Sequence, residues 1–332
     1  MSSGSRFSLT RYLAKKTGYV ALMIFIISLI SFSAVNMAPN SFFASGELNP
    51  NITPEAIEHL KKVYGLDKSL TQQYLSWITA LVQLDFGISF SSGKMVKDEI
   101  LDRLPITLTL NIVSMVLIFI VSIWLGIKAA MKQQSGSDRF IKQFSLVSYS
   151  MPSFYLALIF IMVLAVGFDL FPVSGLHSVD EDAGFWAYYG DMAWHLTLPI
   201  AVIVFGGIGS LTLYVRSLTV EILKSDYIFF ARSRGLSEKT IFTRYILPNL
   251  SAPIITILGL SLPGLIGGSV ILESIFSING MGLLFYQSAL SLDYPVIMGI
   301  LMIGAFLTLL GNILADLVLL LINPYFLQKE VR

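Results

Sequence analysis

Six long apolar runs constrain what this chain can fold into more than any other feature of its sequence. They cover Gly18–Met37, Leu104–Ile127, Phe144–Phe168, Leu196–Val215, Ser251–Leu272 and Val296–Leu321. A helix rises about 1.5 Å per residue, so about 20 apolar residues are enough to cross the hydrocarbon core of a bilayer. Only 13% of the residues are charged, against about 25% in soluble domains. The sequence therefore predicts an all-α integral membrane protein with six transmembrane helices.

The first apolar run follows a basic segment, which is also the pattern of a secretory signal. Arg6, Arg11, Lys15 and Lys16 precede it. Its apolar part is longer than the roughly 7 to 15 residues of a cleaved signal. We therefore expect a retained membrane anchor.

The distribution of Lys and Arg predicts the orientation of these helices. With the N-terminus inside, sixteen basic residues fall on cytoplasmic segments or their flanks and six fall outside. Basic residues concentrate on the cytoplasmic side of membrane proteins. We therefore expect the N-terminus and the C-terminus in the cytoplasm, together with the loop over residues 216–250.

One long stretch, residues 38–103, lacks a membrane-spanning pattern. Thr53-Pro54-Glu55 is typical of a helix start, and Leu70–Leu84 has amphipathic spacing. We expect an external helical region over the membrane core, and one alternative is that it also seats an external partner. The predicted organisation is an N-terminal segment with the first transmembrane helix (1–37), this external region (38–103), a transmembrane core with helices two to six (101–324), and a C-terminal tail (325–332).

Small residues and carboxylates mark positions of interest within the spans. Helices four and five carry Gly206, Gly207, Gly209, Pro263, Gly264, Gly267 and Gly268. Such residues allow close helix packing, and alternatively they permit bending that carries motion to a central pathway. Asp316 lies well inside the last span and Glu273 at the outer end of the fifth. Burial of a carboxylate is costly, so both are functional candidates, although Asp316 is near enough to the cytoplasmic end for a structural role.

No motif for catalysis, nucleotide binding or metal binding is present. The chain lacks H-E-x-x-H, G-x-S-x-G and G-x-x-x-x-G-K-[ST], and it has no Cys. His59, His177 and His195 are scattered. His177 shares a loop with Asp180, Glu181 and Asp182, and this loop is either a solvated acidic segment or a weak site for a hard cation. We expect no catalytic residue, no metal ligand and no bound cofactor on this chain.

A polar and basic island, Asp226–Asn249, separates the fourth and fifth apolar runs. Helix caps can come from Ser225, Asp226, Ser237 and Glu238. Gly235 can end a first short helix in the left-handed conformation, and Pro248 is expected to separate a second helix from the next apolar run. The island therefore predicts a helical hairpin on the cytoplasmic side, where another protein can dock.

The island also follows a known family pattern. It carries Asp-Tyr, then Ala-Arg, then Gly-Leu-Ser at Asp226, Tyr227, Ala231, Arg232, Gly235, Leu236 and Ser237. In this it resembles the coupling loop of the dipeptide, oligopeptide and nickel permeases among ATP-binding-cassette (ABC) importers. The general importer pattern, E-A-A, three residues, G, nine residues, I-x-L-P, is matched at Ala231, Gly235, Leu247 and Pro248. Phe229, Phe230 and Tyr245 replace its Glu, Ala and Ile.

Other stretches are similar to the same family over nearly the whole chain. They are Tyr64-Gly65-Leu66-Asp67, Gln73-Tyr74 with Trp77, Asp85-Phe86-Gly87-Ile88-Ser89, Phe171-Pro172 with Gly175, His195-Leu196-Thr197-Leu198-Pro199, ESIFSINGMG from Glu273 to Gly282, Asp293-Tyr294-Pro295-Val296, and Asn323-Pro324. The family stretch often has Trp-Pro where this chain has Ile278-Asn279.

The resemblance implies a type I ABC importer permease fold and a set of partners. These are a second homologous permease subunit, two ATPase subunits that bind ATP and Mg, and an external solute-binding protein. The ATPase would receive the coupling loop, whose residues are Asp226, Tyr227, Phe230, Ala231, Arg232, Gly235, Leu236, Ser237, Leu247 and Pro248. Tyr227, Phe229, Phe230 and Phe242 would be anchors in its groove, and Arg232 and Arg234 would pair with its acidic residues.

The resemblance favours import of peptides, with nickel or another chelated metal as the alternative. A secondary transporter would need a coupling-ion site and an enzyme would need paired catalytic groups, and neither pattern is visible in the sequence. The substrate pathway stays unassigned. Polar residues on the spans either line it or bond to their own helix, as for Asn111, Ser114, Ser148, Ser150, Ser210, Thr212 and Ser261.

Overall fold

The computed structural model describes residues 3–37, 68–180, 182, 184–265 and 270–322. These residues form helices joined by turns, with one isolated antiparallel bridge between Ile88 and Met95 and no strand among them. The expected all-α class is confirmed. Contacts divide the chain into two units, Met1–Pro105 with Gly280–Leu310, and Ile106–Asn279 with Gly311–Arg332.

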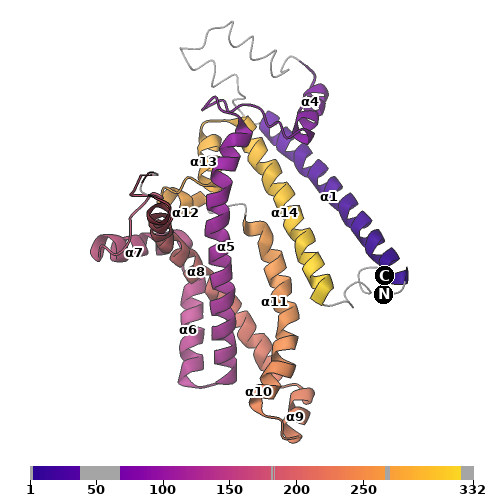
Figure 1. Cartoon of the computed structure of the whole chain (residues 1–332), viewed down its shortest axis with the longest axis vertical. Coiled ribbons are helices and arrows are strands. Elements are labelled where there is room, and N and C mark those ends of the chain that lie inside the picture. Colours follow the sequence, from indigo (N-terminus) through magenta and orange to yellow (C-terminus); the bar gives the residue numbers. More distant parts are fainter. Residues whose placement is uncertain (1–2, 38–67, 181, 183, 266–269, 323–332) are drawn as a thin grey trace. The chain divides into compact units, whose positions relative to one another are not determined.

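The first unit holds two helices that precede the membrane core in sequence, α1 (Ser3–Met37) and α4 (Leu70–Val82). Figure 1 shows α4 beside one end of α1. Aromatic side chains join them, because Tyr74 packs edge-on against Phe32 at 5.3 Å and its hydroxyl lies 2.8 Å from Ser28 Oγ. The amphipathic helix expected over Leu70–Leu84 is confirmed. The helix start expected at Thr53-Pro54-Glu55 lies outside the described residues.

The same unit holds a turn before α5 (Val96–Met131), the helix α13 (Met281–Leu290) and the part of α14 (Tyr294–Ile322) up to Leu310. Asp293, buried at the start of α14, accepts hydrogen bonds from Ser89 Oγ at 2.5 Å and from the N–H groups of Phe90 and Ser91 at 3.1 Å. Val96 and Ile100 pack with Met281, Leu284 and Val296 in a small core. Because α5 begins at Val96, its first residues come from the region expected to be external.

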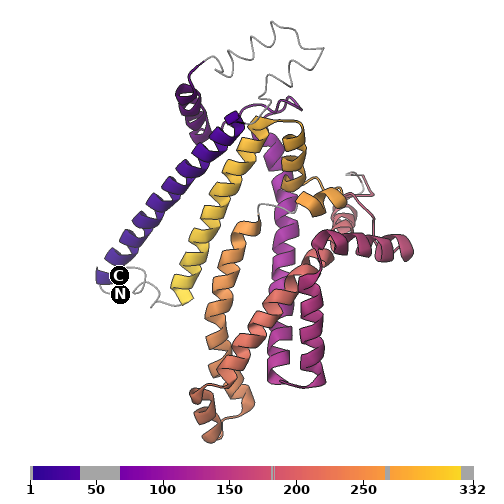
Figure 2. The ribbon, with the colours of Figure 1, turned by 180° about the vertical axis from the view of Figure 1, so that it is seen from behind.

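The second unit is built around α8 (Phe185–Leu223), with α6 (Gly136–Ser150), α7 (Ser153–Phe160) and most of α5 packed along it (Figure 2). A π-helix (Ile161–Gly167) continues α7. The main core collects apolar residues from α5, α7, α8 and α12 (Val270–Ile275). At its edge the fully buried Glu273 accepts a hydrogen bond from Thr107 Oγ1 at 3.1 Å.

The third predicted span, Phe144–Phe168, is not one straight helix. α6 and the α7 segment meet at an angle of 102°. Met151 adopts an extended conformation (φ −84°, ψ 127°) before Pro152, as expected because a proline ring clashes with a helical residue before it. Among the described residues, five helices are long and apolar enough to cross a membrane, or six if the bent pair is counted as one span.

The fifth predicted span, Ser251–Leu272, is also interrupted. α11 (Leu247–Ser261) gives way to a 3-10 turn, Leu262–Leu265, in which Pro263 has no backbone N–H to donate. Asn111 Nδ2 of α5 donates to the carbonyl of Leu265 at 2.7 Å. This polar side chain therefore satisfies a carbonyl group at the end of the 3-10 turn.

Close helix packing explains only some of the glycines in helices four and five. A Cβ on Gly209 would collide with the backbone of α6 at Ser145 and Tyr149, and one on Gly207 would collide with Ile118. A Cβ on Gly206 or Gly264 would meet nothing within 4 Å. Gly267 and Gly268 lie outside the described residues.

Candidate functional site

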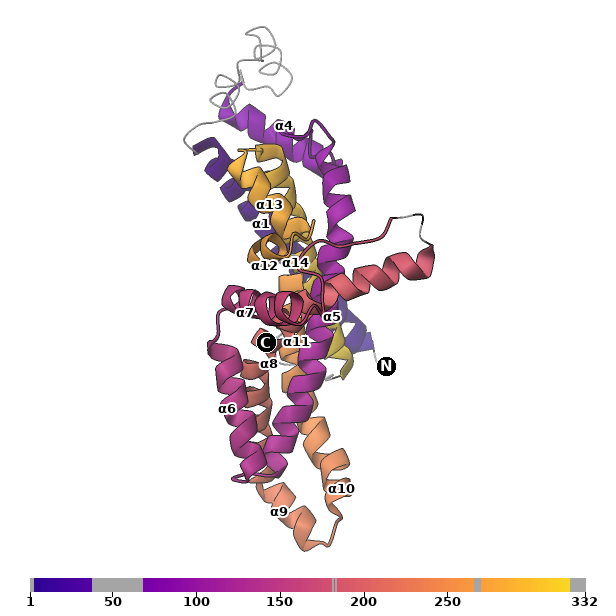
Figure 3. The same cartoon turned by 90° about the vertical axis from the view of Figure 1, so that its left-hand side faces the viewer.

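The polar island forms a helical hairpin that continues α8 and leads into α11. α9 (Asp226–Ser233) is followed by a turn, by the short α10 (Glu238–Ile241) and by a π-helix (Phe242–Ile246) that joins α11. Figure 3 shows α9 and α10 projecting beyond the ends of α5 and α6. The two predicted helices are therefore confirmed, and we call residues 226–246 the hairpin.

Gly235 sets the direction of the turn. Its φ is +75°, in the left-handed region that glycine enters without steric cost. The N–H of Gly235 donates to Arg232 O at 2.9 Å and that of Leu236 to Ala231 O at 3.3 Å, which closes α9. Ser237 Oγ then accepts from the N–H of Thr240 at 3.3 Å and caps α10. The predicted break at Gly235 and the Ser237 cap are confirmed.

Two local expectations are wrong. Ser225 occupies the N-cap position of α9 but its Oγ donates to Ile222 O at 2.5 Å, so it bonds the end of α8 instead of capping α9. Pro248 does not separate the second helix from the apolar run, since α10, the π-helix and α11 are continuous from Glu238 to Ser261. The π-helix bonding before Pro248 widens the turn, which gives the proline ring room that a regular α-turn lacks.

The hairpin has its own apolar core. Ile228 and Ala231 of α9 are buried against three apolar residues that follow the turn, Ile241, Ile246 and Leu250. Leu236 is partly buried against the same core. Ala231 is 3% exposed, so a small side chain is required where α9 packs. The sequence reasoning overlooked this core, although the spacing of three from Ile228 to Ala231 indicates one buried face.

An aromatic pair covers the outer side of α9. Phe229 and Phe230 are 67% and 63% exposed, with ring centroids 6.0 Å apart, and Tyr227 is also exposed. Phe242, by contrast, is partly buried against the hairpin core. Of the four expected aromatic anchors, three are thus accessible and Phe242 mainly supports the fold.

Arg232 is paired within the hairpin. Its Nε and Nη2 donate to the carboxylate of Glu238 at 2.9 and 3.2 Å across the turn. These hydrogen bonds raise the pKa of Arg232, which keeps the guanidinium charged. Arg232 was expected to pair with an acidic residue of a partner, and here Glu238 takes that position. Arg234 is exposed, and no carboxylate among the described residues lies within ion-pair distance of it.

The remaining predicted site residues lie at the two ends of the hairpin. Asp226 is exposed in the first turn of α9. Leu247 and Pro248 are exposed at the start of α11. The structure therefore brings the ten predicted coupling residues together in one projecting element.

The two histidines that the structure describes, His177 and His195, contact other polar and aromatic groups. His177 stacks on Tyr188 with ring centroids 3.9 Å apart, and its Nδ1 lies 3.7 Å from Asp191 Oδ2. His195 Nε2 lies 2.8 Å from Ser178 Oγ, and its Nδ1 lies 3.1 Å from Gly175 O. The described residues contain no group of three or more His, Cys, Asp or Glu that could hold a metal ion. His59, and Glu181 of the acidic loop considered as a cation site, lie outside the described residues.

Known proteins match both parts of the chain. Residues 122–327 match the family described as "Binding-protein-dependent transport system inner membrane component", and residues 9–111 match that of the N-terminal part of such membrane components. "Oligopeptide transport system permease protein AppB" of Bacillus subtilis is 35% identical over 94% of this chain and 98% of its own length. "Dipeptide transport system permease protein DppB" of Escherichia coli (strain K12) is 31% identical over 96% and 99%.

A solved structure shares the fold. The inward-facing MetNI methionine ABC transporter contains a chain that matches 68% of this chain and 96% of its own length, with a TM-score of 0.51 and 16% sequence identity. At that identity the match concerns the fold alone.

Proposed function

Because the chain belongs to the family of binding-protein-dependent transport system inner membrane components, we propose that it forms half of the translocation pathway of an ATP-driven peptide importer. The chain is a multi-pass permease of the bacterial inner membrane, and it is a transport subunit rather than an enzyme.

Peptides are favoured over chelated nickel as the substrate. The relatives AppB of Bacillus subtilis and DppB of Escherichia coli are named for oligopeptide and dipeptide transport, and each covers nearly all of this chain. The sequence motifs alone had left nickel open, since the resemblance includes both substrate classes.

The hairpin is proposed as the element that a separate ATPase subunit grips. The observation that carries this is the exposed pair Phe229 and Phe230 on a helix whose opposite side is packed on its own core. Rigid exposed aromatics are frequent anchors of protein interfaces, because they bury a large apolar area with little loss of conformational freedom. A free membrane-protein loop would gain nothing from presenting them to water.

The proposed assembly has four kinds of component. A second homologous permease subunit completes the pathway, two ATPase subunits bind ATP and Mg, and an external solute-binding protein delivers the peptide. This chain binds no cofactor itself. Both termini and the hairpin face the cytoplasm, and the core over residues 101–324 carries the 216–250 coupling loop.

Reconstituted uptake tests the function. We would assemble the chain with its partners in liposomes and follow a labelled mixture of short peptides and, separately, a nickel chelate. ATP-dependent peptide uptake is the expected result. Uptake of nickel alone would contradict the peptide assignment, and uptake driven by an ion gradient without ATP would contradict the importer assignment.

Alanine variants test the hairpin. Phe229→Ala and Phe230→Ala should each weaken binding of the ATPase subunit by about tenfold or more, because each removes an interface aromatic. Phe185→Ala is a matched control, since Phe185 is 65% exposed at the opposite end of α8. Equal binding by all three variants would refute the proposed docking surface.

A further inference from the structure

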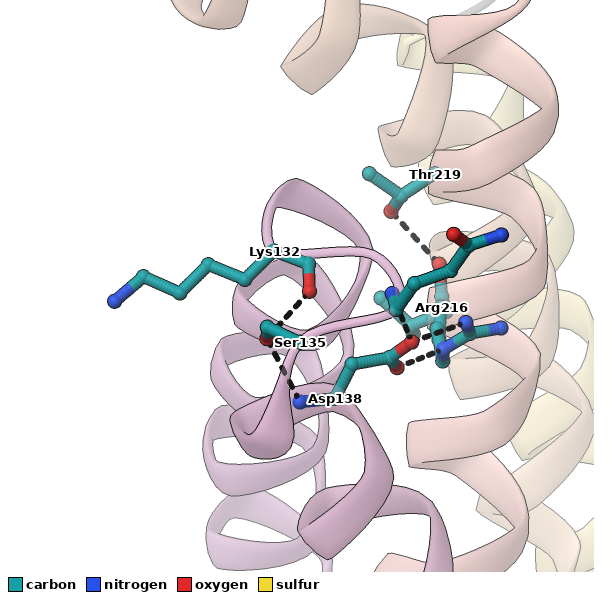
Figure 4. Close-up of polar contacts among 7 residues, drawn as sticks. Lys132, Ser135, Asp138, Arg216 and Thr219 are labelled. Carbon is teal, nitrogen blue, oxygen red and sulfur yellow. Dashed lines mark hydrogen bonds and ion pairs between the residues drawn. The ribbon is translucent and has the colours of Figure 1, made fainter.

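A second Arg–carboxylate pair lies near the hairpin and has no role in the function described so far. Asp138, in the first turn of α6, is fully buried. Arg216 of α8 donates to it with both Nε, at 2.6 Å, and Nη2, at 2.8 Å. Figure 4 shows the two side chains facing each other between the helices. A bidentate hydrogen-bonded ion pair of this kind fixes both the distance between the two helices and their relative orientation.

The carboxylate of Asp138 also closes the turn between α5 and α6. Its Oδ2 accepts from the N–H of Gln134 at 2.9 Å, and Gln134 has a φ of +65°, which is unfavourable for a residue with a side chain. Ser135 Oγ donates to Lys132 O at 2.6 Å and accepts from the N–H of Asp138 at 3.3 Å. One carboxylate thus holds a strained turn and attaches that turn to α8.

Close packing extends the same junction along the helices. A Cβ on Gly126 of α5 would lie 2.7 Å from Cβ of Val215, the residue before Arg216. On α6, Ser148 Oγ donates to the carbonyl of Phe205 in α8. The three helices therefore also pack tightly along the part of α8 that precedes Arg216.

The hairpin core touches this junction directly. Ile127 of α5 and Leu218 and Ile222 of α8 are partly buried against the hairpin core, to which Ile228 and Ala231 belong. Arg216 precedes Leu218 by two positions in α8. A displacement of the hairpin would therefore move residues of α8 that lie next to the Asp138–Arg216 pair.

We propose that Asp138 and Arg216 are positioning residues for transport, which make the α5–α6 turn move as one body with α8 and the hairpin. In this role the pair needs no contact with substrate or nucleotide. It acts by passing displacement of the hairpin to α6, which would otherwise follow only through apolar packing. This inference rests on the proposed function, because it requires that an ATPase subunit moves the hairpin.

The test separates positioning from mere stability by measuring peptides imported per ATP hydrolysed in the reconstituted complex. In Asp138→Asn and in Arg216→Gln, we expect this ratio to fall by about fivefold or more while the complex still assembles and hydrolyses ATP. The double variant should be no worse than either single variant, because the two residues act through one bond. Arg139→Gln, which removes an exposed charge from the same helix turn, is the control and should keep the wild-type ratio.

Milder variants cover the case in which Asp138→Asn fails to assemble. Arg216→Lys keeps the charge but loses the bidentate bond, and Ser135→Ala loosens the turn while both charged side chains of the pair remain. Both should assemble and lower the ratio, Arg216→Lys more than Ser135→Ala. An unchanged ratio in assembled Arg216→Lys and Ser135→Ala complexes, or additive losses in the double variant, would overturn the proposal. Wild-type uptake in the same vesicles is scored separately, so failure of the proposed function would be visible as loss of uptake in the wild type itself.

Discussion

Two Arg–carboxylate pairs among the described residues of the second unit have the same bonding pattern and opposite surroundings. Arg216 and Asp138 have side-chain exposures of 18% and 1%. They are 78 positions apart in the sequence, and they join α8 to α6. Arg232 and Glu238 have exposures of 46% and 57%, and they are six positions apart across one turn. The chemistry is shared, so the difference lies in burial and in what each pair connects.

Burial decides how much each pair contributes. Water and salt weaken an exposed pair, and holding two long side chains in place costs entropy, so the net stabilisation is small. A buried pair is little screened, and the loss of one member leaves the other charge without compensation in a medium of low polarity. We therefore expect the Asp138–Arg216 pair to fix helix positions and the Arg232–Glu238 pair to adjust the hairpin only slightly.

The largest expected effect comes from the buried pair. Asp138→Asn should lower the free energy of unfolding by about 3–5 kcal/mol, because it leaves the Arg216 charge uncompensated. Denaturation of the purified chain in detergent micelles measures this, with Arg139→Gln as the control. If the two variants unfolded alike, the contrast between the pairs would disappear.

A packing variant asks whether the ion pair or the helix contact joins α6 to α8. Gly209→Ala should cost about 1–3 kcal/mol, since its Cβ would collide with the α6 backbone at Ser145. Gly206→Ala, whose Cβ would meet nothing within 4 Å, should cost nothing. A loss at Gly209 greater than that of Asp138→Asn would show that packing outweighs the pair.

Next in size is the turn of the hairpin. Gly235→Val should cost about 1–2 kcal/mol because φ +75° is strained for a β-branched residue. Gly235→Asn should cost clearly less, since Asn enters this conformation more easily. Hydrogen exchange at the amide of Leu236 reports the local opening, and equal protection in both variants would contradict the argument.

The smallest effect is expected for the exposed pair. Glu238→Gln should change stability by less than about 1 kcal/mol. The difference from the wild type should shrink further at high salt, whereas that of Asp138→Asn should persist. Thermal unfolding of both variants at low and at high ionic strength measures this difference. If the stability lost in Glu238→Gln did not depend on salt, the exposed pair would behave like the buried one.

Local signals in the sequence were sufficient for most of the hairpin. The glycine at 235 and the cap at Ser237 act over three or four residues, so the pattern itself contains the information. The bend before Pro152 also had a local signal, which a count of apolar residues ignored. The expected roles of Ser225 and Pro248 were wrong because of the turns beside them. Ser225 bonds to a carbonyl of α8, and Pro248 follows a π-helix that continues into α11.

Contacts between distant residues could not be predicted in this way. Nothing near Asp138 indicates that its partner is Arg216, because the pairing depends on how α6 lies against α8. The Arg232–Glu238 pair spans a turn and so has no helical spacing. The peptide substrate likewise has no short signature, and it is inferred from relatives that match nearly the full chain.

The hydrogen bonds that Asp293 accepts from Ser89, Phe90 and Ser91 form late in the synthesis of the chain. Ser89 is made 204 residues before the carboxylate that holds it. At roughly 5–20 residues per second, a ribosome needs about 10–40 s to reach Asp293. During that interval the N–H groups of Phe90 and Ser91 lack their final acceptor. The turn before α5 is therefore completed only when the last span begins to emerge, and insertion of the final helix closes a segment that was translated near the start.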